Sequence, residues 1–472
     1  MIGRESEINK LMQAFQSENS EFVAVYGRRR IGKTYLVRET LGYNFTFSHT
    51  GMAHTPRMGQ LQAWRSSLID SGLADAILPK NWIEAFDELK RLVRQSTHKR
   101  KVLFIDEMPW LDTQHSGFVA ALEYFYNGWC SARKDIVLIA CGSATSWIIN
   151  KVINGHGGLH NRVTHRIALE PFSLAECQLM AQSKGLDMTR QMIAQCYMIM
   201  GGVPYYWSLL QRGKSLAQNI DNLFFSATGE LHNEFDNLFN SLFTSPKPYL
   251  NIIRILGSKG TGMTRAELIE HKSINDNGHL QTMLRELEYC GFIRSYRTYG
   301  KKSRDKIFQL IDCFTIFYFR FLEDSEQYGE HYWSQSQNQP TINNWLGLAF
   351  ERLCLLHINQ LKRALGVSGI ICSVGAWRSA HDKPRAQVDL VIDRHDDVID
   401  LCEMKYYAGE FEIDAKYERT LSERRLRFIE QTHTRKAVHI VFVTTYGLKA
   451  NMHSDIVQNT ITLDQLFHDS NV

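Results

Sequence analysis

Two glycines near the start of the chain frame a loop that could hold a phosphate group. The apolar segment Val23–Tyr26 runs into Gly27, three arginines and an isoleucine, and the loop closes with Gly32, Lys33 and Thr34. Glycines let backbone N–H groups surround a polyphosphate, Lys33 adds positive charge near its β- and γ-phosphates, and the Thr34 hydroxyl can bind Mg²⁺. The spacing therefore predicts a P-loop for ATP and Mg²⁺, although the arginines could simply be solvated. The expected nucleotide contacts are Gly27, Arg30, Ile31, Gly32, Lys33, Thr34 and Tyr35.

A second apolar segment carries two carboxylates at its end. Lys101–Ile105 contains a run of consecutive apolar residues and is followed by Asp106 and Glu107. Such a run predicts a strand buried on both faces of a parallel sheet, whose C-terminal end shares an edge with the P-loop. We expect Asp106 to hold Mg²⁺ through its water shell and Glu107 to polarise the attacking water. The alternative for Glu107 is a surface carboxylate.

A third strand is expected over Ile136–Gly142, and small polar residues follow it. We expect Ser143 to contact the γ-phosphate and sense its loss, with Thr145 as the second choice, although small residues also end strands merely to permit a turn. Arg162 lies in a glycine-rich loop. It is expected to reach a γ-phosphate as an arginine finger, either from a neighbouring copy in a homo-oligomer or within its own chain. A solvated arginine is the alternative.

The elements that must position these groups alternate between helices and strands. A short turn and an amphipathic helix are expected over 1–15, helices over 32–40, 58–70 and 81–97, and further strands over 45–48 and 166–169. This alternation predicts a doubly wound α/β domain with a P-loop NTPase fold over residues 1–171. Residues 172–245 are expected to be helical.

Several of these motifs together resemble a known family. They are Gly3–Glu5, Gly27–Thr34, the strand ending in Asp106-Glu107, Cys141–Ser146 and Gly201–Tyr206. In this combination the chain resembles the AAA-related ATPases first catalogued from archaea, which also occur in bacteria and are similar to origin-recognition initiators and signal-transduction ATPases. The resemblance implies an AAA-like fold in which residues 172–245 form a helical lid over the nucleotide. It also implies that Val203 and Pro204 contact the adenine, although the residues themselves are equally compatible with an ordinary turn.

The next part of the chain has the pattern of a winged helix, expected over 246–333. Helices are expected over 249–256, 264–269 and 278–290, and strands over 292–297 and 305–310. The helix 278–290 carries few basic residues, so we expect DNA binding to depend on the phosphate backbone and to be weakly sequence-specific. A protein-interaction or lid module is the alternative. The expected phosphate contacts are Arg297, Lys301, Lys302 and Arg304.

A second group of chemically useful residues follows a polar linker, expected over 334–344. Asp389 lies in one strand of a predicted hairpin, and Glu403 and Lys405 share a face of the other. Two carboxylates and a lysine can bind a divalent cation and orient a water toward a phosphodiester. A five-residue loop over 394–398 would place Asp389 opposite Glu403, whereas a four-residue loop would face it to Cys402 and weaken the site.

Together with Glu351, in a helix expected over 343–364, these residues resemble the PD-(D/E)xK nuclease superfamily. The resemblance implies a restriction-endonuclease-like α/β domain over 345–472, a kind of domain that the ATPase family above often carries. It makes Glu351, Asp389 and Glu403 metal ligands, and Asp389, Glu403 and Lys405 the catalytic residues. Val388 stands where many members have proline, which costs no ligand. The basic residues of 424–427 could guide DNA, or lie on a solvated helix face.

Composition sets the outer limits of these interpretations. Hydrophobic residues make up 44% of the 472 residues and charged residues 22%, and the net charge is +4. These values are ordinary for globular proteins. We expect a cytoplasmic protein without membrane segments, because there is no long uncharged apolar run and the cysteines are scattered.

The expected function is an ATP-hydrolysing DNA-processing enzyme that couples the ATPase and the winged helix to metal-dependent phosphodiester cleavage. The alternative is an ATP-switched regulator that binds DNA or protein, with the nuclease-like fold as a non-catalytic docking domain.

Overall fold

The computed structural model describes residues 1–154, 158–159, 161–243, 245–274, 278–300, 306–324, 328–379 and 386–468. The chain divides into two compact units. Unit 1 comprises Met1–Glu170 with Leu238–Thr244, and unit 2 comprises Pro171–Asn237 with Ser245–Val472.

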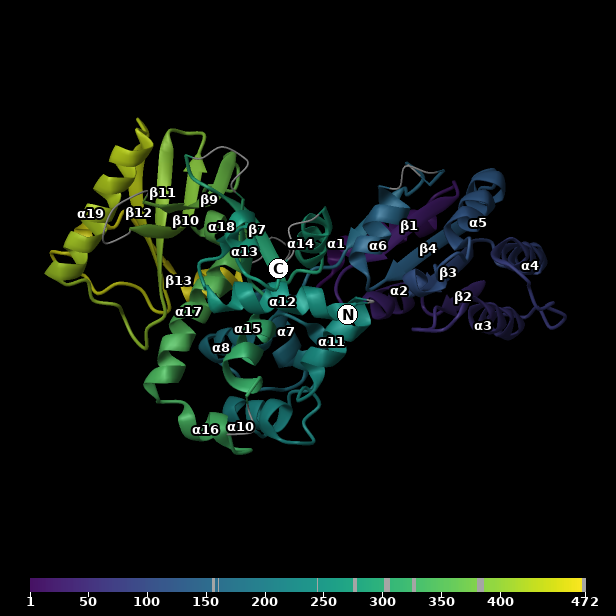
Figure 1. Cartoon of the computed structure of the whole chain (residues 1–472), viewed down its shortest axis with the longest axis horizontal. Helices are drawn as coiled ribbons and strands as arrows, with labels where there is room; N and C mark the ends of the chain where they lie inside the picture. The colour runs from purple at the N-terminus through teal and green to yellow at the C-terminus, as the bar shows by residue number, and fades with distance from the viewer. Residues whose placement is uncertain are drawn as a thin grey trace. The chain divides into compact units, whose positions relative to one another are not determined.

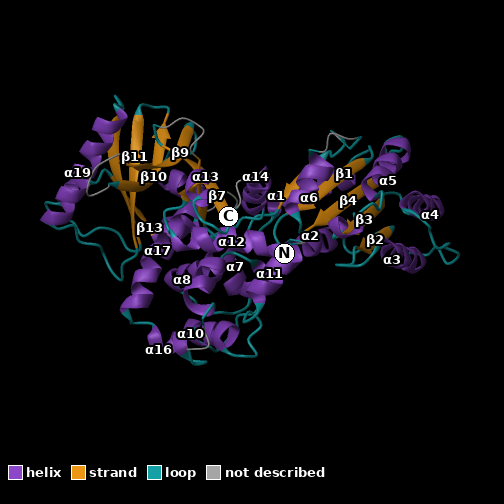
Figure 2. Ribbon diagram, in the orientation of Figure 1, coloured by secondary structure: helices purple, strands orange, loops and turns teal. Residues whose placement is uncertain are grey.

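Unit 1 is built on a parallel sheet, seen in Figures 1 and 2. Its described residues form a five-stranded sheet in the order β2-β3-β4-β1-β5, and each neighbouring pair runs parallel. The strands are β1 (Glu21–Tyr26), β2 (Phe47–Thr50), β3 (Lys101–Asp106), β4 (Ile136–Gly142) and β5 (His165–Ala168). Apolar residues fill β3 and β4 because both faces of these strands are covered.

Helices cover both faces of this sheet. One face packs against α1 (Glu5–Gln16) and α2 (Lys33–Thr40), and the other against α3 (Arg57–Asp70), α4 (Trp82–Gln95) and α5 (Phe118–Phe125). The expected doubly wound α/β fold of a P-loop NTPase is therefore confirmed. Shorter helical segments complete the unit: η1 (Met108–Leu111), η2 (Tyr126–Cys130), α6 (Thr145–Trp147) and η3 (Ile148–Ile153).

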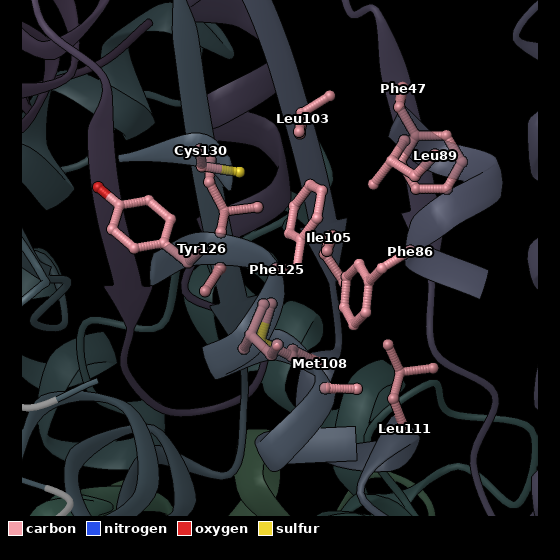
Figure 3. Close-up of a cluster of buried hydrophobic side chains, with 14 of the residues drawn as sticks. Phe47, Phe86, Leu89, Leu103, Ile105, Met108, Leu111, Phe125, Tyr126 and Cys130 are labelled. Carbon is pink, nitrogen blue, oxygen red and sulfur yellow. The ribbon is translucent and has the colours of Figure 1, made fainter. Parts of the chain in front are cut away.

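Alternation along the strands divides the core between the two faces. Leu103 and Ile105 of β3 point into the cluster shown in Figure 3, whereas Phe104 between them belongs to the opposite face. In the cluster, the rings of Phe86 from α4 and Phe125 from α5 stack with centroids 4.7 Å apart. Burying such a ring stabilises the fold by about 2–3 kcal/mol. This packing holds β3, and with it the carboxylates at its end, in a fixed position.

Unit 2 begins with helices, as expected for 172–245. These are α7 (Leu174–Ser183), α8 (Arg190–Met200), α9 (Pro204–Ser208), α10 (Leu216–Ile220), η4 (Asp221–Phe225) and α11 (Glu234–Leu242), whose end belongs to unit 1. The later helices are α12 (Pro246–Ser258), α13 (Arg265–Ile269), α14 (Gly278–Tyr289), α15 (Cys313–Phe317), η5 (Tyr318–Leu322), α16 (Tyr332–Ser336), α17 (Pro340–Leu356), α18 (Ile358–Ala364), α19 (Ala415–Thr432), η7 (Ser454–Ile456) and η8 (Leu463–Phe467).

One sheet runs through most of unit 2. Its described residues form an eight-stranded sheet in the order β13-β12-β11-β10-β9-β7-β8-β6. The strands are β6 (Met263–Thr264), β7 (Ile293–Thr298), β8 (Lys306–Leu310), β9 (Cys372–Arg378), β10 (Gln387–Arg394), β11 (Val398–Lys405), β12 (Ala437–Thr444) and β13 (Asn459–Thr462). Strands of the expected winged helix thus join those of the expected nuclease-like domain, because β7 pairs in parallel with β9.

The segment 334–344, expected as a polar linker, is mostly helical. It contains the end of α16 and the start of α17. Ile342 is buried, and Trp333 and Trp345 on either side of the segment pack edge to face, with ring centroids 5.9 Å apart. Local composition suggested a linker because the segment is rich in polar residues, and most of these are exposed; the buried tryptophans on either side and Ile342 attach the segment to the core.

Candidate functional site

The candidate nucleotide site of unit 1 lies where three parallel strands end. Tyr26 of β1 pairs with Gly142 of β4, and Ile105 of β3 pairs with Ala140. Because β4 lies between β1 and β3 and all three run in the same direction, the P-loop, Ser143 and the carboxylates Asp106 and Glu107 meet at the C-terminal ends of these strands.

The P-loop glycines occupy backbone positions that other residues would strain. Gly27 has φ +144°, and a Cβ there would lie 2.4 Å from the carbonyl oxygen of Leu169. Gly32, with φ +90°, precedes the first residue of α2. Arg30 also adopts a positive φ, 68°, so the loop is tightly wound between the glycines. Ile31 is buried against the core, whereas the Tyr35 side chain is exposed.

Lys33 is buried, and its ammonium group donates hydrogen bonds to three acceptors. Its Nζ donates to the carbonyl oxygens of Gly27 and Arg28, both at 2.9 Å, and to the Ser143 hydroxyl at 3.0 Å. A buried ammonium is stable only when such partners replace its water. The network fixes the positive charge inside the loop, where a phosphate would bind.

The residues expected around Mg²⁺ are joined by hydrogen bonds. The Thr34 hydroxyl donates to Asp106 Oδ2 at 2.7 Å. Glu107 accepts from the Ser143 hydroxyl at 2.7 Å and from the Ser143 backbone N–H at 3.2 Å. A hydroxyl and a carboxylate are the hard oxygen ligands that Mg²⁺ prefers, so this donor set fits the ion. The roles of Ser143 as sensor and Glu107 as base stay predictions.

Arg162 lies at the opposite end of the strands from the P-loop, near the start of β1 and β5. The backbone N–H of Thr164 donates to the carbonyl oxygen of Phe22, so the residues before β5 lie beside the start of β1. The P-loop follows the far end of β1, roughly 16 Å away at the usual rise per residue of a strand. The expectation that Arg162 could reach a γ-phosphate within its own chain is therefore wrong, since β5 runs parallel to β1. Its action from a neighbouring copy stays a prediction.

Pro204 begins α9 in unit 2, and Val203 before it is buried. The turn is tight, because a Cβ on Gly202 would lie 2.0 Å from the carbonyl oxygen of Phe172. The Trp207 ring N–H donates to the carbonyl oxygen of Gly201 at 2.8 Å and braces the turn. The contact of Pro204 with adenine stays a prediction.

The acidic residues of unit 2 that the sequence predicts as metal ligands line one cavity of about 350 Å³. Glu351 comes from α17, Asp389 from β10, and Glu403 and Lys405 from β11. Leu390 pairs with Cys402 across the hairpin, which is the register of the five-residue loop and places Asp389 opposite Glu403. The structure therefore brings all four of these sequence-predicted residues to one place. We call this cavity the acidic pocket.

Burial and neighbouring charges act differently on two of these carboxyls. Burial, with the nearby charges of Asp389 and Glu403, raises the pKa of Glu351 to about 7. Burial would also raise the pKa of Glu403, but Arg424, Lys405 and the Tyr417 hydroxyl outweigh it and lower the pKa overall. Glu403 is thus held as a carboxylate by its partners.

Two partners of Glu403 come from α19 and were not predicted from the sequence. The Arg424 guanidinium donates to Glu403 Oε2, and the Tyr417 hydroxyl donates to Oε1. Lys405 Nζ lies 3.1 Å from Oε1. The spacing of Tyr417, Arg424 and the buried Leu421 places them on one helix face, and this signal could have pointed to Arg424 among the basic residues of 424–427.

The fit of a metal to the acidic pocket is incomplete. In the described part of the chain, no group of three or more His, Cys, Asp or Glu side chains could hold a metal ion. Glu351, Asp389 and Glu403 are ligands of the right chemical kind, but both oxygens of Glu403 already accept hydrogen bonds. Their role as metal ligands stays a prediction.

The candidate DNA contacts are described only in part. Arg297 is exposed and pairs through its backbone with Gly375 of β9. Lys301, Lys302 and Arg304 lie outside the described residues.

Comparison with known proteins agrees with the site in unit 1. Residues 1–210 match the family model of an ATPase domain predominantly from Archaea. This part of the chain is called the ATPase domain below. The expected resemblance to ATPases first catalogued from archaea is thereby confirmed for these residues.

Proteins similar to this chain over most of its length share little sequence identity with it. An uncharacterized protein of Methanocaldococcus jannaschii is 22% identical over 392 residues, covering 80% of this chain and 81% of the relative. The Walker-type ATPase of Pyrococcus abyssi is 18% identical with a TM-score of 0.47, covering 68% of this chain and 96% of that one. The ORC2 protein of Aeropyrum pernix is 14% identical with a TM-score of 0.40, covering 73% of this chain and 93% of that one.

Among the helices that the structure describes, none has both the length and the apolar character needed to cross a membrane.

Proposed function

We propose that this protein is an ATP-hydrolysing DNA-processing enzyme in which the ATPase domain controls metal-dependent phosphodiester cleavage by the C-terminal part of unit 2. The observation that carries the proposal is the acidic pocket, which gathers Glu351, Asp389, Glu403 and Lys405 from three separate elements. The same chain carries a connected P-loop and carboxylate network in unit 1. A nucleotide-driven switch and a hydrolytic centre are thus encoded together.

In the ATPase half, each residue has a distinct role. Lys33 would bind the β- and γ-phosphates, and Thr34 and Asp106 would hold Mg²⁺. Mg²⁺, when bound, neutralises the charge that develops on the phosphates. Glu107 orients the attacking water, and Ser143 positions Glu107 through the two hydrogen bonds described above.

In the nuclease half, Glu351, Asp389 and Glu403 would hold a divalent cation, which stabilises charge on the attacked phosphate. Lys405 would orient the attacking water and favour its deprotonation. DNA would reach this centre through the winged helix, by phosphate contacts from Arg297, Lys301, Lys302 and Arg304 that carry little sequence information. The continuity of β7 with the sheet of the acidic pocket supports a common DNA path.

A specific observation favours a second candidate. Glu403 is fully paired with Arg424, Tyr417 and Lys405, which is what a structural ion cluster would look like. On this alternative, the nuclease-like fold is a docking domain, and the ATPase switches its binding to DNA or protein.

The deciding experiment measures divalent-metal-dependent cleavage of single-stranded, duplex and branched DNA, with and without ATP. Wild type is compared with Asp389→Ala, Lys405→Ala and the control Asp396→Ala, which removes an exposed carboxylate of the same hairpin. We expect wild type and Asp396→Ala to cut in an ATP-dependent manner, and the two pocket variants to hydrolyse ATP without cutting. If no protein cuts any substrate while all hydrolyse ATP, the second candidate replaces the first.

The position of Arg162 supports a homo-oligomer in which this residue completes a neighbouring ATP site. Mixing Arg162→Ala with Lys33→Ala tests this directly. Each variant alone lacks ATPase activity on this proposal, and mixed assemblies regain it, because the Lys33→Ala copy supplies Arg162 to a copy with an intact P-loop. Mixtures as inactive as the separate variants would contradict action from a neighbour.

A further inference from the structure

Helix α19 presents a charged residue from the side that packs on the sheet. Tyr417, Leu421, Arg424 and Phe428 follow the spacing i, i+4, i+7 and i+11, which is one face of a helix. Leu421 and Phe428 are buried, and the Phe428 ring packs against Trp377 with centroids 5.4 Å apart. These apolar anchors fix the helix, so Arg424 is directed at the acidic pocket by the fold.

The guanidinium of Arg424 meets the one pocket carboxylate that is most heavily paired. Arg424 and Glu403 retain only 23% and 13% side-chain exposure, so water screens their attraction weakly. Tyr417 takes the other oxygen of Glu403. Asp389, by contrast, accepts from the neutral amide of Gln387. Arg424 and Arg427 of α19 both line the pocket, and Arg424 is paired with Glu403.

We propose that Arg424 is a competing cation, which occupies Glu403 Oε2 and must leave it before a divalent metal can bind in the acidic pocket. This inference rests on the proposed nuclease function and adds a condition to it. A metal ion and a guanidinium cannot both use the same carboxylate lone pairs, and each compensates the same negative charge. The metal-binding arrangement and the arrangement in this structure are thus two alternatives, separated by a movement of the Arg424 side chain.

The charge balance predicts what happens when the guanidinium is removed. In Arg424→Gln the pocket loses one positive charge while Glu351, Asp389 and Glu403 remain. A divalent cation entering the pocket is then no longer repelled by the guanidinium and no longer competes with it for Glu403. We expect the dissociation constant for Mn²⁺ to fall about fivefold or more, since charges that are partly buried interact more strongly than those at the surface.

Binding of Mn²⁺ to the full-length protein, without DNA or nucleotide, tests this. Free Mn²⁺ is followed by electron paramagnetic resonance, and the binding that disappears in Asp389→Asn is assigned to the acidic pocket. Arg419→Gln is the matched control, because Arg419 is an exposed arginine of the same helix and does not line the cavity. We expect Arg424→Gln to bind the ion more tightly than wild type, and Arg419→Gln to match wild type.

The outcomes separate this inference from the proposed function. If Asp389-dependent binding exists but Arg424→Gln binds no more tightly than wild type, the competing-cation inference is overturned alone. If no protein shows Asp389-dependent binding, the metal-dependent function fails and the inference falls with it. Should Arg424→Gln not fold, Arg424→Met removes the same positive charge from Glu403 and keeps a long side chain; unchanged Mn²⁺ affinity in that variant overturns the inference.

Discussion

The Ser143 hydroxyl makes hydrogen bonds to both Lys33 and Glu107, and replacing Ser143 with alanine removes both. The hydroxyl accepts from Lys33 Nζ at 3.0 Å and donates to Glu107 at 2.7 Å. Both hydrogen bonds involve a charged partner. Lys33 keeps two further acceptors, and Glu107 keeps the backbone N–H of residue 143. We therefore expect Ser143→Ala to leave the P-loop formed, to alter ATP binding little, and to loosen the orientation of Glu107.

The magnitude follows from the bonds lost. A hydrogen bond to a charged group contributes about 1.5–3 kcal/mol. If that loss falls on the transition state, where Glu107 must be aligned with the attacking water, kcat decreases about 10- to 100-fold. The KM for ATP should change by no more than about threefold, because the contacts that bind ATP equally well in the ground state and the transition state are little affected.

The assay is steady-state release of phosphate over a range of Mg²⁺-ATP concentrations. Thr145→Ala is the matched control, because its hydroxyl lies 3.5 Å from the carbonyl oxygen of Ser143 and makes a weak contact at best. We expect Thr145→Ala to retain kcat within about threefold of wild type. A Ser143→Ala enzyme with wild-type or higher kcat would refute the reasoning, as would an equal loss in Thr145→Ala.

Three further changes probe the ATPase domain. Gly27→Ala should abolish nucleotide binding measured with a fluorescent ATP analogue, because the added Cβ would clash with the carbonyl oxygen of Leu169. Gly42→Ala is the control: Gly42 also has a positive φ, but a Cβ there would meet no atom within 4 Å, so this variant should still bind nucleotide. Thr34→Val should lower ATP hydrolysis at least about tenfold and raise the Mg²⁺ requirement, since the hydroxyl that donates to Asp106 is lost. The pKa of His49 is lowered to about 4 by burial, against 6.5 ordinarily. The unfolded chain therefore gains a proton that the folded one does not as pH falls below 6.5, so stability decreases by about 2 kcal/mol between pH 7.5 and 5. Urea denaturation should show this slope in wild type and a shallower one in His49→Gln; equal slopes would contradict the assignment.

Strands and motif residues of unit 1 were accessible from the sequence because they depend on short spacing. The run before Asp106 is apolar because both faces of β3 are covered, and the P-loop glycines stand where positive φ is required. The hairpin strands of Asp389 and Glu403 were accessible in the same way, but the sequence left their register open between two loop lengths, and the observed pairing corresponds to the five-residue loop. The boundaries of these elements follow from local chemistry.

Contacts between distant segments were not accessible in this way. The end of the sheet at which Arg162 lies depends on the direction of β5 relative to β1, and the residues of the Arg162 loop do not determine that direction. The joining of β7 to β9, and the burial of Ile342 and of the tryptophans that flank 334–344, likewise depend on which partners the rest of the chain provides. Polar composition at these places was compatible with either outcome.

The sequence by itself determined which side chains could do chemistry: the lysine and threonine of the P-loop, the adjacent carboxylates at the end of β3, and the Glu-x-Lys pattern of β11. Only the tertiary structure decided how they are engaged, with Ser143 between Lys33 and Glu107, and with Arg424 on Glu403. The physical reason is that residue type and spacing fix local backbone geometry, whereas an ion pair or a hydrogen bond between remote residues forms only where packing brings them within about 3 Å.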